Sequence, residues 1–197
     1  MSTPTRSRRR ALLSVASEQA GYFTASEALD AGYSYQAQRH NVIAGNWTRV
    51  DRGIFRLPEW PVGRHEDLVR WTLWSRGKGV ISHLSALSVY DLGDVNPARI
   101  HLTVPHSFRK KAKGLVLHKN DIPQDDVRGH EGFAVTTPMR SILDSAADGI
   151  EIDQLARVIE DALERGLVTK KSLRSRADAF GPAGALAIER ALTQGTG

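Results

Sequence analysis

The sequence predicts an α+β fold with a small N-terminal domain and a larger second domain. Residues 1–60 alternate short helical and strand-like segments around tight turns. Two prolines in the segment 58–61 then interrupt both helices and strand ladders, which indicates a domain boundary. Strand-like segments follow, and the chain beyond residue 150 has helical patterns only. We therefore predict a winged helix-turn-helix at 1–60, followed at 61–197 by a mixed α/β domain with a helical C-terminus.

The start of the chain is predicted to be a basic arm followed by one short helix. The basic residues 1–10 are typical of a flexible arm. An amphipathic helix over 11–20 ends at Gly21, and Tyr22–Thr24 can add a strand to a small sheet. The arm either enters a DNA minor groove or only solubilises the terminus. Its predicted DNA contacts are Arg8, Arg9 and Arg10.

Two short helices joined by a tight turn are predicted next. The first covers 26–30 and is stopped at Gly32. Ser34 can cap a second helix over 35–44, which Gly45 can end in a left-handed conformation. An arrangement of this kind presents the second helix to the major groove of DNA.

The outward face of the second helix has side chains suited to base contacts. Ala37 and Val42, with part of Ile43, are predicted to pack inward at helical spacing. Glutamine can read adenine, and arginine can read guanine, in the major groove. The alternative is an ordinary solvated helix face. The predicted DNA contacts of this helix are Ser34, Tyr35, Gln36, Arg39 and His40.

A basic β-hairpin is predicted after this helix. Two short strand-like runs between residues 47 and 57 pivot on the turn at 51–53, where a glycine allows positive φ. Arg49 and Arg52 lie nearest the turn and are the predicted phosphate contacts. Asp51 would repel phosphate, so we expect its side chain to stabilise the turn. Trp47 is expected in the core.

Arginine alone supplies the positive charge of the first domain. The whole chain has a net charge of +5, and residues 1–60 hold eight arginines, no lysine and five acidic residues. The planar guanidinium group suits phosphates and base edges better than the point charge of lysine. This distribution favours a polyanionic partner, and we predict double-stranded DNA.

The second domain is predicted to open with helices over 64–76 and 82–90. Strands follow at Arg99–Val104, which alternates apolar and polar residues like a half-buried strand, and at Leu115–Lys119. The basic run RKKAK at 109–113 is expected to blunt a hairpin tip between them, with a second nucleic-acid contact as the alternative. The remaining predicted elements are a short strand at Phe133–Val135, a helix that opens at Thr137-Pro138, and helices over 152–164, 170–179 and 182–193.

The sequence contains no pattern typical of an enzyme. The seven histidines are scattered, without an HxxxH or HExxH array. His101 and His118 could be neighbours on paired strands, but two imidazoles without a third ligand do not make a metal site. The chain lacks a Walker loop, GxGxxG, GxSxG and the acid/E-x-K pattern of restriction-type nucleases. We predict no catalytic residue, no metal and no cofactor. The alternative is a metal-dependent nuclease built on Asp121, Asp125, Asp126 and Glu131.

The composition indicates a folded protein of a reducing compartment. A hydrophobic fraction of 41% and four tryptophans suffice for a packed core. No apolar run approaches the roughly 18 residues of a membrane span. The chain has no cysteine, and its basic start lacks the apolar core of a secretory signal. We expect a cytoplasmic protein with no membrane partner.

Four segments resemble the AbiEi-type antitoxins. Residues 31–57, from Ala-Gly-Tyr-Ser to Arg-Val-Asp-Arg-Gly-Ile-Phe-Arg-Leu, resemble the N-terminal winged helix of that family. Segments 82–86 (SHLSA), 100–105 (IHLTVP) and 135–140 (VTTPMR) resemble the α/β domain that follows it, so the similarity spans roughly residues 8–147. Similar N-terminal regions also occur fused to a small nuclease-like domain. The C-terminus of this chain is short and helical and lacks the acid/E-x-K pattern, so we do not expect nuclease activity from the resemblance.

The resemblance implies a transcriptional autorepressor within a bicistronic toxin–antitoxin locus. Its cognate toxin would be a nucleotidyltransferase, and in this type IV arrangement the antitoxin can oppose the toxin without a stable complex, although some relatives contact their toxins. We therefore expect a DNA-binding antitoxin that reads inverted repeats in its own promoter. The alternative is a protein-interaction module that neutralises a toxin directly without binding DNA.

Overall fold

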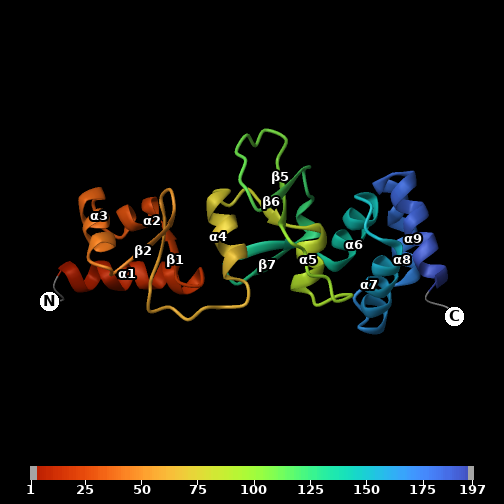
Figure 1. The fold of residues 1–197 in the computed structure, drawn as a ribbon, viewed down its shortest axis with the longest axis horizontal. Helices are drawn as coiled ribbons and strands as arrows, with labels where there is room; N and C mark the ends of the chain where they lie inside the picture. Colours follow the sequence, from red (N-terminus) through yellow and green to blue (C-terminus); the bar gives the residue numbers. More distant parts are fainter. Residues whose placement is uncertain (1–3, 195–197) are drawn as a thin grey trace. The chain divides into compact units, whose positions relative to one another are not determined.

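The computed structural model describes residues 4–194 and has an α+β fold. The chain divides into two compact units (Figure 1). Unit 1 comprises the residues up to Lys78 together with Gly129–Phe133, and unit 2 comprises Gly79–Arg128 and the residues from Ala134 onward. None of the helices in the described part of the chain has the length and apolar character needed to cross a bilayer.

Unit 1 contains a three-stranded antiparallel sheet with strand order β1-β3-β2. Phe23 of β1 and Arg49 of β2 both pair with Phe55 of β3. The elements are α1 (Pro4–Glu18), β1 (Tyr22–Thr24), α2 (Ala25–Asp30), α3 (Tyr35–Ile43), β2 (Thr48–Asp51), β3 (Ile54–Arg56) and α4 (Glu66–Trp74). The buried apolar core is formed by Leu12, Ala16, Phe23, Ala28, Trp47, Phe55 and Leu57. Trp47 therefore lies in the core, as predicted.

The helix ends of unit 1 follow from local sequence. Thr24 caps α2 in a capping box with Glu27. Ser34 caps α3, because its hydroxyl accepts a hydrogen bond from the backbone N–H of Ala37 at 3.3 Å. Gly45 follows α3 with φ of +75°, a conformation that side chains with a Cβ rarely adopt. The predicted cap and stop of α3 are thus confirmed.

The arm predicted at residues 1–10 is helical from Pro4 onward, which corrects the expectation of a flexible segment. Arginine is a good helix former, and no glycine or internal proline interrupts the chain before Glu18. Leu12 and Ala16 are buried and anchor the helix, which then extends backward over the basic residues.

Unit 1 extends past the boundary expected at Pro58–Pro61, because α4 packs against β1 and β3. Leu68 and Val69 are buried in this helix. The guanidinium of Arg56 lies 3.1 Å from the carboxylate of Glu66 and also donates to the carbonyls of Trp60 and Pro61. These contacts fix the segment that joins β3 to α4.

The second sheet has five strands in the order β6-β5-β4-β8-β7. Its strands are β4 (Val80–Ile81), β5 (Ile100–Val104), β6 (Leu115–Lys119), β7 (Val127–His130) and β8 (Phe133–Thr136). β4 pairs antiparallel with β5 and parallel with β8. The sequence analysis did not predict β4 or β7, because strands of two to four residues have little periodicity.

β5 and β6 are parallel, which corrects the hairpin predicted between them. The register pairs Ile100 with Leu115 and Val104 with Lys119. Residues 105–114, with the basic run, therefore form a crossover rather than a hairpin tip. β5 lies between β6 and β4, and strands in this position are covered on both faces. His101 and Thr103 are accordingly buried, although the alternating pattern predicted solvent exposure.

The helices α6, α7, α8 and α9 lie together in unit 2 (Figure 1). Their buried apolar side chains, with those of α5, form one core. α6 and α7 both pack against α9, and α5 packs against α6. At Gly184 of α9 a Cβ would lie 3.3 Å from the Cβ of Ala147, so glycine allows the close approach to α6. The helices are α5 (His83–Val89), α6 (Pro138–Ala147), α7 (Ile152–Glu164), α8 (Lys170–Ala177) and α9 (Pro182–Gln194), with short 3-10 turns η1 (Gln124–Asp126) and η2 (Asp178–Phe180).

Candidate functional sites

The predicted DNA contacts of α3 lie on one exposed face of unit 1. The side chains of Ser34, Gln36, Arg39 and His40 are exposed, and Tyr35 is 69% exposed. Ile43, expected to pack partly inward, is 74% exposed at the last position of the helix. The face therefore combines hydrogen-bonding groups with two large apolar side chains.

A buried glutamine fixes α3 to the rest of unit 1. The sequence pattern assigned the inward face to Ala37 and Val42. Val42 packs against the core as predicted, but the fully buried residue of this helix is Gln38. Its side-chain amide donates to the carbonyl oxygens of Ala25 at 3.0 Å and Tyr33 at 3.1 Å. A polar inward side chain carries no hydrophobic signal, so periodicity could not identify it.

Replacing Gln38 by leucine should destabilise unit 1 by about 1–3 kcal/mol, because the two hydrogen bonds to the backbone carbonyls of Ala25 and Tyr33 are lost. Urea denaturation of the full-length protein would measure the change. Gln36→Leu, on the exposed face of the same helix, should alter the free energy of unfolding by no more than about 0.5 kcal/mol. Equal effects of the two substitutions would contradict the role of the buried amide.

The hairpin between β2 and β3 exposes Arg49 and Arg52. Within residues 4–194, neither side chain forms an ion pair, and Arg39 forms none either. The carboxylate of Asp51 accepts a hydrogen bond from the backbone N–H of Arg52 at 2.6 Å and lies 4.0 Å from Arg70. Asp51 thus stabilises the turn, as predicted, and its charge is partly compensated.

The arginines of α1 are exposed but are not part of an extended arm. The stem of Arg8 lies near Gly32, where a Cβ would approach it to 3.2 Å. Arg9 lies 3.7 Å from the carboxylate of Glu59. A helix replaces the extended arm that was expected to enter a minor groove, and DNA contact by Arg8, Arg9 and Arg10 stays a prediction.

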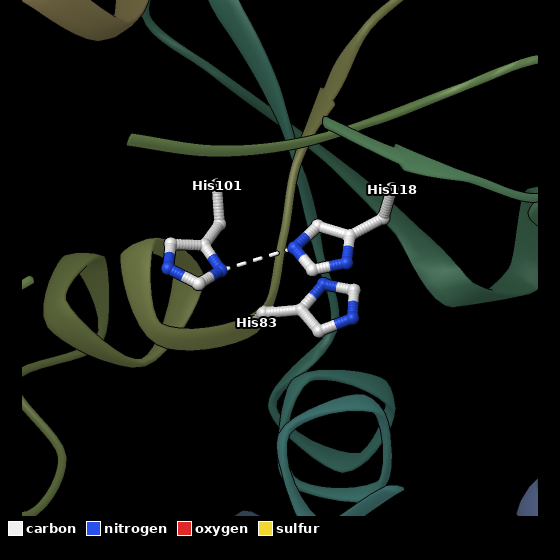
Figure 2. Close-up of side chains that lie close together, drawn as sticks. All are labelled: His83, His101 and His118. Atoms are coloured by element: carbon white, nitrogen blue, oxygen red, sulfur yellow. Dashed lines mark hydrogen bonds between the residues drawn. The ribbon is translucent and has the colours of Figure 1, made fainter. Parts of the chain in front are cut away.

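Unit 2 brings three histidines together, from the start of α5, from β5 and from β6 (Figure 2). The Nδ1 atom of His101 lies 3.0 Å from the Nε2 atom of His118. The rings of His83 and His118 are stacked, with centroids 3.5 Å apart and planes inclined by 12°. One nitrogen of each ring lies within 4.8 Å of the other two. The sequence analysis paired only two of these residues.

Hydroxyl groups position the histidine cluster. The hydroxyl of Thr103 donates to Ser82 Oγ at 2.7 Å, and Ser82 Oγ lies 2.9 Å from Nδ1 of His83. The backbone N–H of His101 donates to Ser85 Oγ at 2.9 Å. His83 has φ of +50°, a conformation that costs a residue with a Cβ about 1–2 kcal/mol. The fold thus holds His83 in place against local strain.

Burial keeps these imidazoles neutral. Burial, followed by the neighbouring His118, lowers the pKa of His101 to about 4. Burial, His118 and His101 lower the pKa of His83 still further. Burial also lowers the pKa of His118, which the carboxylate of Asp148 opposes. At neutral pH each ring therefore retains a nitrogen lone pair.

In chelator-containing buffer, the free energy of unfolding should fall as the pH drops from about 6.5 toward 4. Unfolded imidazoles take up protons near pH 6.5, whereas folded His101 resists protonation until its pKa of about 4. The unfolded state binds more protons in this window and is favoured as the pH falls. Urea denaturation over a pH series would measure the slope. His101→Gln should reduce the slope of the free energy of unfolding against pH. His106→Gln, at an exposed position, should leave this slope unchanged. Equal slopes in the two variants would contradict the assignment of the pH dependence to His101.

A polar cavity of about 610 Å³ adjoins the cluster, and His83 lies in its wall. Within this wall the Nε atom of Arg140 donates to both carboxylate oxygens of Asp144 at 2.9 Å. Its Nη1 donates to Asp126 at 3.3 Å, and Arg176 donates to both oxygens of Asp126 at 2.9 Å. Arg140, Asp126 and Asp144 are all buried.

Asp126, one of the acids of the alternative nuclease site, belongs to this network of ion pairs. Asp126 is held by two guanidinium groups, and Glu131 belongs to unit 1 rather than unit 2. Within residues 4–194, the histidine cluster is the group of potential metal ligands that the structure brings together. Among residues 4–194, no group of three potential metal ligands includes Asp121, Asp125, Asp126 or Glu131.

His83, Arg140 and Asp144 were not predicted from the sequence as site residues. His83 follows a two-residue strand that periodicity could not detect, and its contacts depend on the sheet register. The i,i+4 spacing of Arg140 and Asp144 was a usable signal, because oppositely charged residues at this spacing share a helix face.

Comparison with known proteins provides a fold relationship. No protein-family model matches the chain, and no curated protein is significantly similar to it in sequence. Its fold is similar to the crystal structure of the RV2827C protein from Mycobacterium tuberculosis, with a TM-score of 0.57 and 13% sequence identity. The match covers 96% of this chain and 81% of that one. At this level of identity the likeness concerns the fold.

Proposed function

We propose that the chain is a DNA-binding transcriptional regulator whose unit 1 acts as a winged helix-turn-helix. One observation carries the proposal: the exposed face of α3 and the adjacent hairpin present arginines without ion-pair partners among residues 4–194. In the same unit, Arg56 and Arg70 lie within ion-pair distance of acidic groups. Arg39, Arg49 and Arg52, on the predicted DNA-facing surface, are thus among the guanidinium groups of unit 1 that remain available.

The side chains of α3 suit the chemistry of the major groove. Arg39 can donate to guanine, and Gln36 can pair with the edge of adenine. The exposed apolar surfaces of Tyr35 and Ile43 suit the methyl group of thymine. Arg49 and Arg52 at the hairpin would contact flanking phosphates, which position the protein without reading sequence.

The resemblance to AbiEi-type antitoxins extends the proposal to an operon. The chain would be a cytoplasmic autorepressor that binds inverted repeats in its own promoter, and unit 2 would oppose a nucleotidyltransferase toxin.

A second function is favoured by the exposure of Tyr35 at 69% and Ile43 at 74%, because apolar side chains on one face also suit docking of a protein. In that case the chain would bind a toxin directly and not bind DNA.

Binding to the upstream DNA of its own gene should weaken steeply with salt, because each phosphate contact releases counterions. Fluorescence anisotropy over a salt series would give the slope of log K against log salt concentration. The double variant Arg49→Ala/Arg52→Ala should reduce that slope by about 2, one unit per lost phosphate contact. Arg157→Ala, at an exposed position on α7, is the matched control and should leave the slope unchanged.

Absence of binding at low salt would overturn the regulatory proposal. Co-purification with the product of a neighbouring gene under those conditions would support the direct-binding alternative. A slope unchanged in the double variant would refute phosphate contact by the hairpin.

A further inference from the structure

We propose that His83, His101 and His118 bind one divalent transition-metal ion of the Zn²⁺ type through their ring nitrogens (Figure 2). All three residues belong to unit 2, whereas the proposed DNA-binding surface belongs to unit 1. The proposal of a metal site therefore does not depend on the proposal of DNA binding.

The nitrogen positions are close to those that an ion needs. Zinc–nitrogen bonds of about 2.0–2.1 Å in a tetrahedral site separate the ligand atoms by about 3.3 Å. Nδ1 of His101 and Nε2 of His118 already lie 3.0 Å apart. The largest separation in the cluster is within 4.8 Å, so the third ring has to move inward by roughly an ångström. Rotation about side-chain bonds can supply this movement.

The donor set selects the class of metal. Imidazole suits Zn²⁺, Cu²⁺, Fe²⁺ and Ni²⁺, whereas Mg²⁺ and Ca²⁺ require oxygen ligands. Three histidines with a fourth position left open form a recurrent zinc ligand set. His83 belongs both to the cluster and to the wall of the polar cavity, so water or a small anion in that cavity can occupy the fourth position.

Hydrogen bonds to hydroxyl groups can orient the first ligand. Ser82 Oγ lies 2.9 Å from Nδ1 of His83, so this hydroxyl holds the imidazole ring in its orientation. Thr103 in turn donates to Ser82 and fixes that hydroxyl.

The surroundings of the cluster favour a cation. The negative charge of Asp148 acts on both His101 and His118, and Asp148 also lies in the cavity wall. It is opposed by the positive charges of Arg99, which acts less strongly on His101, and of Arg140, which acts on His83. The charged groups of that wall are the carboxylates of Asp121, Asp126, Asp144 and Asp148 and the guanidiniums of Arg140 and Arg176, so acids outnumber bases. The left-handed backbone at His83 is the kind of strain that folded proteins retain at functional positions.

The test uses the full-length, tag-free protein after removal of metal with a chelator. Titration with Zn²⁺ should show one ion per chain and should raise the Tm, because the ion binds only the folded state. Co²⁺ should give the intense visible absorption of a tetrahedral site. His118→Gln, at the least buried position of the three, should abolish both effects. His106→Gln, at an exposed position outside the cluster, should behave like the wild type.

X-ray absorption of the Zn²⁺-loaded wild type supplies a measurement that does not depend on the folding of any variant. Three imidazole ligands would support the site. Failure of the wild type to bind Zn²⁺ or Co²⁺ would overturn the proposal, as would equal binding by His118→Gln or a ligand shell with fewer than three imidazoles. DNA affinity measured in chelator should equal that in Zn²⁺, which separates this test from the test of unit 1.

Discussion

Replacing Arg140 by methionine should destabilise unit 2 by about 3–5 kcal/mol, the cost of breaking a buried ion pair by removing one partner. The guanidinium of Arg140 donates to both Asp144 and Asp126, and all three side chains are buried. Methionine preserves much of the volume but leaves Asp144 without a bonded cation and Asp126 with Arg176 alone. Hydrogen exchange of amides in α6 would measure this loss in unit 2 separately from unit 1.

Arg174→Met is the matched control. Arg174 also pairs with a carboxylate, that of Glu189 at 2.8 Å, but its side chain is 51% exposed. Solvent screens exposed ion pairs, so this variant should stay close to the wild type. Comparable losses in the two variants would show that burial does not determine the effect.

The destabilisation by Arg140→Met should be smaller at pH 5 than at pH 8. Burial raises the pKa of Asp144 even though the hydrogen bond from Arg140 opposes the rise. Without that bond the pKa should rise further, so the folded state would bind a proton that the unfolded state does not. Stability of the variant relative to the wild type then increases as the pH falls. A difference independent of pH would contradict this account.

Arg39→Ala should lower the affinity for the promoter sequence by about 1–3 kcal/mol and relax the preference at the contacted base pair. Arg39 lies on the exposed face of α3, and its side chain forms no ion pair with any residue in 4–194. Competition binding with promoter and random DNA would measure both affinities. The affinity for random DNA should change little, because a base contact adds little to sequence-independent binding.

The hairpin variant Arg49→Ala/Arg52→Ala is the contrasting case. Loss of phosphate contacts should weaken binding to promoter and random DNA by similar factors. If Arg39→Ala and the hairpin variant acted alike on both DNA molecules, the division between base reading by α3 and phosphate contact by the hairpin would be wrong.

Local signals in the sequence determined most of unit 1. The hydroxyl of Ser34 caps α3, and Gly45 ends it with positive φ, because both effects depend on residues only a few positions apart. The positive charge and the exposure of Arg39, Arg49 and Arg52 also follow from the local sequence. The predicted arm was wrong because a helix anchored by Leu12 and Ala16 extends back over arginines, which are good helix formers.

Apart from the i,i+4 pair Arg140–Asp144, which has a local signal, tertiary structure decided the sites of unit 2. His83 and His118 are neighbours because β5 and β6 run parallel and α5 begins beside them, and nothing in the local sequence specifies that register. The same applies to Asp126, which lies fifty positions from its partner Arg176. Helix caps and turns are short-range interactions that a few consecutive residues determine. Clusters of buried polar side chains require segments that are distant in sequence to meet, so only the packed sheet and helices could bring them together.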